Sequence, residues 1–269
     1  MNVTPLYPST AGSLPLKGLR LRERLPAPLL YSNFVTSLDG RIALGGPDRQ
    51  THSVPKETSN SRDWRLYQEL GAQADVLITS GSLFRQIQNG EVRDVLPIGL
   101  KYEDLRQWRT EHDLNAQPDI AIISGSLDLP LDTLVGIAKD RRVRVLTGAQ
   151  AAWKRKAALR DAGIDVIEAG AGARVEGQLL RDALVALGAQ RMYSIAGPQV
   201  LHMLLAARVL DRLYLTLAGR VLGGAEFDTL CIGPTLEPAP KLKLADLHLD
   251  PEAPDGAGQL LATYDIDYD

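Results

Sequence analysis

Residues 191–219, RMYSIAGPQVLHMLLAARVLDRLYLTLAG, decide the fold class. Two short, largely apolar runs, RMYSI and DRLYLTLAG, enclose a segment whose apolar residues recur with helical period. Pro198 follows Gly197 and fits the first position of a helix, where its missing amide costs no hydrogen bond. We read the stretch as a strand, a helix and a second strand, which is the unit from which parallel sheets are built.

The same alternation runs through most of the chain. Further strands are predicted at LLYSNFV (29–35), DVLITS (75–80), DIAIIS (119–124), RVRVLTG (142–148) and DVIEAG (165–170), with helical segments between them. Continuous apolar strands separated by helices predict an α/β fold with a mostly parallel central sheet and helices on both faces. QLLATYDIDYD (259–269) is expected to add an antiparallel C-terminal strand. Residues 1–27 are predicted to form an irregular N-terminal arm, residues 28–269 a single domain, and 85–118 an insertion with a helix at EDLRQWRTEHDL.

Composition limits the classes of function. The 269 residues are 45% apolar and 23% charged, with a net charge of -3, so a substantial core is expected and no nucleic-acid-binding surface. Cys231 is the single cysteine, which excludes an intrachain disulfide and a paired-thiol metal site, and the four histidines lack partners at metal spacing. No signal peptide or membrane-length apolar run is present, so we expect a cytoplasmic protein that binds neither metal nor membrane.

Small polar residues follow several predicted strands. The strand ends continue into Gly81-Ser82, Gly125-Ser126, Gly148 and Ala196-Gly197-Pro198. Because the carboxyl ends of parallel strands share one edge of a sheet, glycines and hydroxyls there suit a phosphate-containing ligand. The helix start at Pro198 in particular suits a pyrophosphate. Neither a GxGxxG fingerprint nor a Walker loop occurs, which disfavours a standard Rossmann domain.

Three longer motifs carry a family resemblance. SNFVTSLDGRIA (32–43), DVLITSGS (75–82) and IAGPQVLHMLLAARVLDRLYLTLAGRVLGG (195–224) resemble the reductase domain of the riboflavin biosynthesis deaminase/reductase family. The resemblance implies a dihydrofolate-reductase-like fold, NADPH as cofactor, reduction of 5-amino-6-(5-phosphoribosylamino)uracil and a homodimer. A stand-alone reductase is expected, because no deaminase-type zinc motif precedes it. The C-terminal strand would also leave an exposed sheet edge in a monomer unless it were covered.

The resemblance also implies site residues. Asp39 is the candidate catalytic residue, and the expected substrate-binding residues are Asn33, Ser37, Gly40, Arg62 and Asp63. The expected cofactor-binding residues are Thr79, Ser80, Gly81, Ser82, Ser124, Thr147, Ala196, Gly197, Pro198, Gln199, Val200, Gly223 and Gly224. Two alternatives stay open from the residues alone: Asp39 and Gly40 would also form an ordinary turn with the carboxylate capping local amides, and Arg62 and Asp63 a solvated first helical turn.

The substrate side departs from the family pattern. Ile195 stands where the family usually has a glutamate, and FRQIQ (84–88) replaces a frequent acidic pair. A diverged substrate and poor turnover of the riboflavin intermediate are therefore expected. A dihydrofolate or pterin reductase and a catalytically inactive nucleotide-binding homologue remain alternatives, and the preference for NADPH over NADH rests on the resemblance alone.

Overall fold

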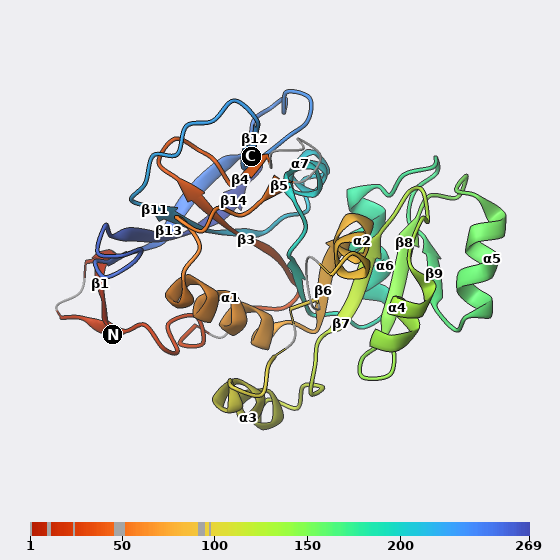
Figure 1. Cartoon of the computed structure of the whole chain (residues 1–269), viewed down its shortest axis with the longest axis horizontal. Coiled ribbons are helices and arrows are strands. Elements are labelled where there is room, and N and C mark those ends of the chain that lie inside the picture. Colours follow the sequence, from red (N-terminus) through yellow and green to blue (C-terminus); the bar gives the residue numbers. More distant parts are fainter. Residues whose placement is uncertain (1, 10–11, 24, 46–51, 91–94, 97) are drawn as a thin grey trace. The chain divides into compact units, whose positions relative to one another are not determined.

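The computed structural model of the chain describes residues 2–9, 12–23, 25–45, 52–90, 95–96 and 98–269. Residues 1, 10, 11 and 24 of the predicted arm, and 91–94 and 97 of the predicted insertion, lie outside this set. The chain groups into two compact units, whose elements are labelled in Figure 1. Unit 1 comprises residues 1–24, 31–70 and 210–269, and unit 2 comprises residues 25–30 and 71–209.

Unit 2 is built on a five-stranded parallel sheet. Its strands, in spatial order, are β10 (Arg191–Ser194), β6 (Val76–Ser80), β7 (Asp119–Ile123), β8 (Val143–Thr147) and β9 (Asp165–Glu168). Every residue of β8 is buried, and β6 is buried up to its last residue. The continuous apolar runs are therefore strands covered on both faces, as the sequence predicts.

The strand order of unit 2 determines on which face of the sheet its helices lie. They are α2 (Gly81–Gln88), α3 (Glu103–Glu111), α4 (Leu131–Ile137), α5 (Trp153–Asp161), α6 (Gly177–Ala186) and α7 (Pro198–Ala206). From β6 to β9 the chain steps in one direction, and α6 then returns it to β10 on the other side of β6. Right-handed crossovers consequently place α6 on the opposite face from α2, α4 and α5. α2 contacts α4, whereas α6 contacts α7 (Figure 1). The predicted α/β class with helices on both faces is confirmed.

Unit 1 contains a mixed sheet. Its strands, in spatial order, are β2 (Leu14–Pro15), β1 (Asn2–Tyr7), β13 (Lys241–Asp250), β14 (Gln259–Asp267), β11 (Arg212–Ala218) and β3 (Leu29–Ser37), whose first two residues belong to unit 2. β3 and β11 are parallel, and the other neighbours are antiparallel. A small second sheet consists of β12 (Phe227–Asp228), β4 (Ala43–Gly45) and β5 (His52–Ser53).

The C-terminal strand β14 is antiparallel to its neighbours, as predicted, and the edge that it would otherwise expose is covered. β13 covers β14 along its whole length, from Lys241 opposite Asp267 to Asp250 opposite Gln259. The apolar alternation in KLKLADLHLD is the sequence signal for β13. The homodimer prediction therefore rests on the family resemblance alone.

The expectation of an irregular N-terminal arm is also wrong. β1 pairs with β13, and the core of unit 1 includes apolar residues of the arm, namely Val3, Leu16 and Leu19, together with Leu66 and Leu261. The Glu69 carboxylate accepts hydrogen bonds from the amides of Gly18 and Arg20, at 2.6 and 2.9 Å. A six-residue strand containing Pro5 has too little periodicity to be recognised from sequence.

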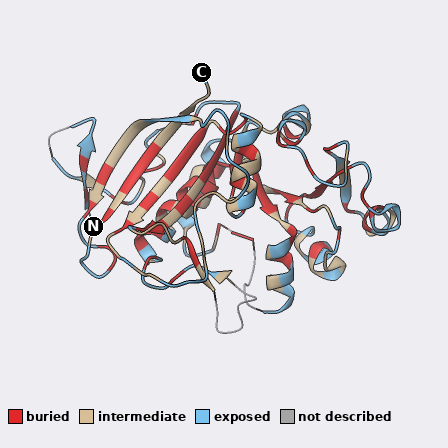
Figure 2. Cartoon of the chain, turned by 90° about the horizontal axis from the view of Figure 1, so that it is seen from above, coloured by how far each residue is buried: buried red, intermediate tan, exposed pale blue. Residues whose placement is uncertain are grey.

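Helix α1 (Ser61–Gln73) covers one face of the unit 1 sheet up to Leu70. Asn60 Oδ1 caps its start by accepting from the amides of Arg62 and Asp63, at 3.0 and 2.9 Å. Near its other end the Tyr31 hydroxyl donates to the Leu70 carbonyl. Figure 2 shows buried residues along the strands and on the inner sides of the helices. None of the described helices is both long and apolar enough to cross a membrane.

Candidate functional site

In unit 2 the chain passes from β6 through β7 and β8 to β9 on one side of β6, and then returns to β10 on the other side. The topological switch point therefore lies between β6 and β10. Such a switch point is where open parallel sheets bind ligands, at the carboxyl ends of the strands. β6 leads into α2 and β10 leads into α7, and the Ile195 amide donates to the Ile78 carbonyl at 2.9 Å. Neither helix has a side-chain N-cap. First-turn amides without intrahelical acceptors, at the positive ends of two helix dipoles, suit a phosphate or pyrophosphate.

Gly197, the N-cap of α7, leaves the space beside it open. Its φ is −73°, and an added Cβ would meet no atom within 4 Å. A larger side chain would therefore fill space that the protein itself leaves free. On the β6 side the hydroxyl oxygens of Ser80 and Ser82 lie 2.6 Å apart. Small, hydrogen-bonding side chains and one open glycine thus lie at the switch point, which suits a phosphate-containing ligand.

The ends of β7 and β8 have a different construction. Ser124 Oγ accepts the Leu127 amide at 3.0 Å, and Thr147 is fully buried with an Oγ1 that has no partner among the described residues. At Gly148 an added Cβ would lie 2.1 Å from the Gly172 carbonyl oxygen. The missing side chain of Gly148 makes room for the loop at Gly172 and not for a ligand. The expected close approach of a phosphate to Gly148 is therefore wrong.

The sequence-predicted cofactor residues therefore divide between the units. Eleven of them lie along the carboxyl edge of the unit 2 sheet: Thr79, Ser80, Gly81, Ser82, Ser124, Thr147, Ala196, Gly197, Pro198, Gln199 and Val200. Gly223 and Gly224 belong to unit 1, on the loop that follows β11, with φ of 68° and 90°.

Asp39 ties two loops of unit 1 together. Its carboxylate accepts hydrogen bonds from the Ser37 hydroxyl at 2.5 Å and from the amides of Leu222 and Gly223 at 3.2 and 2.8 Å. These bonds, that of Ser37 foremost, hold the pKa of Asp39 well below its usual range. A carboxylate that stays ionised has no proton to relay near neutral pH. The geometry thus favours the capping alternative over the predicted proton relay, and we assign Asp39 to positioning the 219–224 loop.

The remaining polar groups of this turn also bond internally. Ser37 Oγ accepts the Arg41 amide at 3.0 Å, and Gly40 adopts a φ of 81°, which favours glycine. The Arg41 guanidinium lies 3.3 Å from the Asp39 carboxylate and 4.0 Å from the centre of the Phe227 ring. Asn33 differs, because it is half-buried and its side-chain amide has no partner in the part of the chain that the structure describes.

The partners of Arg62 contradict its predicted substrate-binding role. Its guanidinium forms a bidentate ion pair with the fully buried Asp250, at 2.6 and 2.7 Å, and a further bond to Glu252 at 2.9 Å. The hydrogen bonds to Asp250 raise the pKa of Arg62 further. This arginine joins α1 to the end of β13. If it bound a phosphate instead, the buried carboxylate of Asp250 would be left unpaired.

Asp63, the neighbouring residue, is buried without a cationic partner in hydrogen-bond contact. Its Oδ1 accepts the Thr216 hydroxyl at 2.7 Å. Burial raises the pKa of Asp63 to about 6, and the Thr216 hydrogen bond and the charge of Arg20 oppose the rise only in part. The alternative of a solvated first turn is therefore excluded for this residue.

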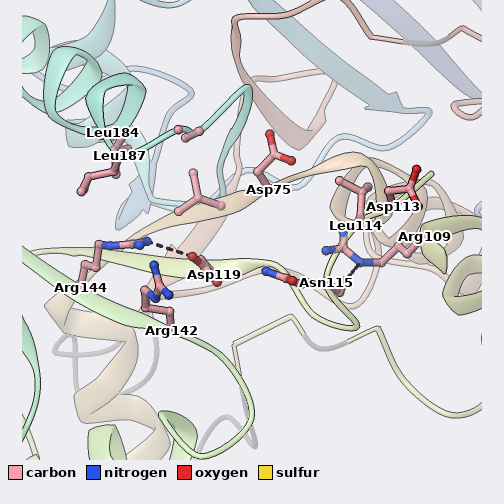
Figure 3. Close-up of a pocket in the computed structure, with 13 residues that line it drawn as sticks. Asp75, Arg109, Asp113, Leu114, Asn115, Asp119, Arg142, Arg144, Leu184 and Leu187 are labelled. Carbon is pink, nitrogen blue, oxygen red and sulfur yellow. Dashed lines mark hydrogen bonds and ion pairs between the residues drawn. The ribbon is translucent and has the colours of Figure 1, made fainter.

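A polar cavity of about 270 Å³ lies at the opposite, amino edge of the unit 2 sheet (Figure 3). Its charged groups mostly bond within the protein. Arg144 pairs with Asp119 at 2.9 Å, Arg109 donates to the carbonyls of Ala72 and Ala74 at 2.8 Å, and Asp75 accepts backbone amides. The network holds strand starts together. Among the described residues no group of three His, Cys, Asp or Glu side chains could hold a metal ion.

One protein-family model matches most of the chain. The family model described as RibD C-terminal domain matches residues 28–252. The chain belongs to this family. The resemblance seen in the sequence motifs is thereby confirmed, and membership supports a reductase role. No curated protein matches the chain.

Solved structures share the fold at low sequence identity. A pyrimidine reductase-like protein from Corynebacterium diphtheriae has a TM-score of 0.68 and 21% identity, over 96% of this chain and 97% of that one. RibD of Acinetobacter baumannii has a TM-score of 0.58 and 17% identity, over 89% of this chain and 58% of its own. The riboflavin biosynthesis reductase Rib7 of Saccharomyces cerevisia has a TM-score of 0.54 and 12% identity, over 91% and 92%.

Proposed function

We propose that the protein is an NADPH-dependent reductase of a ribosylaminopyrimidine such as 5-amino-6-(5-phosphoribosylamino)uracil. The single observation that carries the cofactor part is the switch point of unit 2, where two helices without side-chain caps begin beside open Gly197. Family membership supports the reaction class.

The cofactor supplies a hydride when bound, and the protein has to hold, orient and shield the reactants. The amides at the starts of α2 and α7 would bind the pyrophosphate. Ser80 and Ser82 would add hydroxyl contacts, and the buried hydroxyl of Thr147 would be available to the adenosine half. In unit 1, Asp39 fixes the loop that carries Gly223, while Asn33 offers an unengaged amide to the substrate.

Gly197→Val tests the cofactor site. The protein leaves room for the side chain, and φ of −73° suits valine, so the unfolding midpoint should hardly change. The added methyl groups would obstruct a pyrophosphate and weaken NADPH binding by more than about tenfold. Gly136→Val is the matched control, because Gly136 is exposed on α4 with equally open surroundings.

Titration of NADPH fluorescence with all three proteins decides the question. Equal affinities for the wild type and Gly197→Val would exclude this turn as the pyrophosphate site. NADPH oxidation is then compared with the ribosylaminopyrimidine and with dihydrofolate as acceptors. Faster turnover of dihydrofolate would replace the proposed substrate with a pterin.

A further inference from the structure

Asp63 lies at the same end of unit 1 as the turn of Asp39. Tyr31, near the start of β3, bonds to Leu70, near the last turn of α1, whereas Asp63, in the first turn of α1, bonds to Thr216 near the end of β11. The helix therefore runs opposite to the parallel pair β3 and β11. This orientation brings Asp63 to their carboxyl ends, where the 37–41 turn and the 219–224 loop begin.

Strand register places Asn33 on the same face. Side chains alternate along β3, so Asn33 and Val35 share the face of Tyr31, which contacts α1. Asn33 is opposite Tyr214 and Val35 is opposite Thr216 in the parallel pairing. Asn33 is thus a diagonal neighbour of Thr216 across the two strands. We call Asn33, Asp63 and Thr216 the α1 polar cluster.

The second carboxylate oxygen of Asp63 is unengaged. Asp63 is 8% exposed, and no described residue donates to its Oδ2. The charged or titratable groups that act on it are Arg20, from the N-terminal segment, and Tyr67, one turn along α1. Thr216 and Asn33 are uncharged.

The Arg20 guanidinium contacts residues other than Asp63. Its guanidinium donates to Thr263 at 2.9 Å, approaches Asp246 at 3.5 Å and lies 4.7 Å from the centre of the Tyr214 ring. Burial of Asp63 therefore outweighs the attraction of Arg20, and with a pKa of about 6 roughly half of the Asp63 side chains are protonated at pH 6 and about a tenth at pH 7. Asp39 has the opposite environment, in which donors fix the ionised form.

We propose that Asp63 is the acid of the substrate site, which protonates the substrate nitrogen as the hydride reaches the adjacent carbon. This inference rests on the proposed function. The ribosylamine ring first opens: the anomeric C–O bond breaks, its oxygen takes the N–H proton, and a C=N bond forms. The carbon of this bond then accepts the hydride from NADPH, and the π electron pair takes the proton from Asp63 onto nitrogen. The products are the amine, NADP⁺ and the Asp63 carboxylate, which regains a proton from water. Asn33 would orient the same nitrogen.

The test is the pH dependence of single-turnover NADPH oxidation with 5-amino-6-(5-phosphoribosylamino)uracil. The wild-type rate should fall about tenfold per pH unit above a pKa near 6. Asp63→Asn should lose about 10²-fold or more at pH 6 and lack this pH dependence. Thr216→Val should displace the fall to higher pH, because the Thr216 hydrogen bond lowers the pKa of Asp63. NADPH affinity should be equal in the three proteins.

The outcomes separate the two proposals. Wild-type rate and pH dependence in Asp63→Asn would overturn the acid role and leave the reductase assignment intact. A wild type that neither binds NADPH nor oxidises it with this pyrimidine overturns both. If Asp63→Asn does not fold, Thr216→Val and a ¹³C-carboxyl NMR titration of the wild type decide, and titration of Asp63 at the ordinary aspartate pKa overturns the acid role.

Discussion

Asp63→Asn should stabilise the protein at alkaline pH. The folded-state pKa of Asp63 is about 6, against an ordinary value of 3.8. Between these values the folded protein binds more protons than the unfolded chain, so the free energy of unfolding falls as the pH rises. A rise of about two pKa units corresponds to a total fall of about 3 kcal/mol in the free energy of unfolding. Roughly half of this fall takes place between pH 5 and pH 8.

Asparagine retains an oxygen that accepts the Thr216 hydroxyl but carries no charge. The variant should therefore lack this part of the pH dependence, and its free energy of unfolding relative to the wild type should rise by about 1.5 kcal/mol from pH 5 to pH 8. Urea unfolding of both proteins at the two pH values measures the difference, in which other titrating groups cancel. Parallel stability curves would refute a pKa raised by burial.

Three further predictions concern other parts of the chain. Arg62→Ala leaves buried Asp250 unpaired and should lower the free energy of unfolding by about 3–5 kcal/mol in urea; a loss as small as that of Arg155→Ala, at an exposed pair, would contradict this. Ile195→Glu should raise turnover of the ribosylaminopyrimidine, because a glutamate could hydrogen-bond the substrate where isoleucine cannot; turnover no faster than that of the wild type would contradict this. Sedimentation at micromolar concentration should show a homodimer, which a monomer over that range would refute.

Periodicity sufficed for the parallel part of the fold but not for the N-terminal arm. The strands of unit 2 are continuous apolar runs, and their order places the predicted Ser80 and Gly197 at one edge. β1 is short, and it is stabilised by pairing with β13, more than 200 residues away in the chain. No local pattern therefore reveals it.

The roles of charged residues were less predictable, because a side chain's partners depend on tertiary contacts. The family resemblance implies a catalytic role for Asp39 and a substrate-binding role for Asp63. Three donors hold Asp39 ionised, while burial raises the pKa of Asp63 to about 6. Arg62 is paired with Asp250, which lies 188 positions away in the chain.

The segmentation of unit 1 has a consequence for synthesis on the ribosome. Unit 2 is nearly continuous, with residues 71–209 in one stretch, whereas unit 1 needs its last segment, 210–269, to supply β11, β13 and β14. Until that segment emerges, β1 and the apolar face of α1 have no sheet to join. The earlier segments must wait exposed while some 140 intervening residues are translated, which takes about 7–28 s at 5–20 residues per second. The first 70 residues are accordingly the part of this nascent chain most in need of a chaperone.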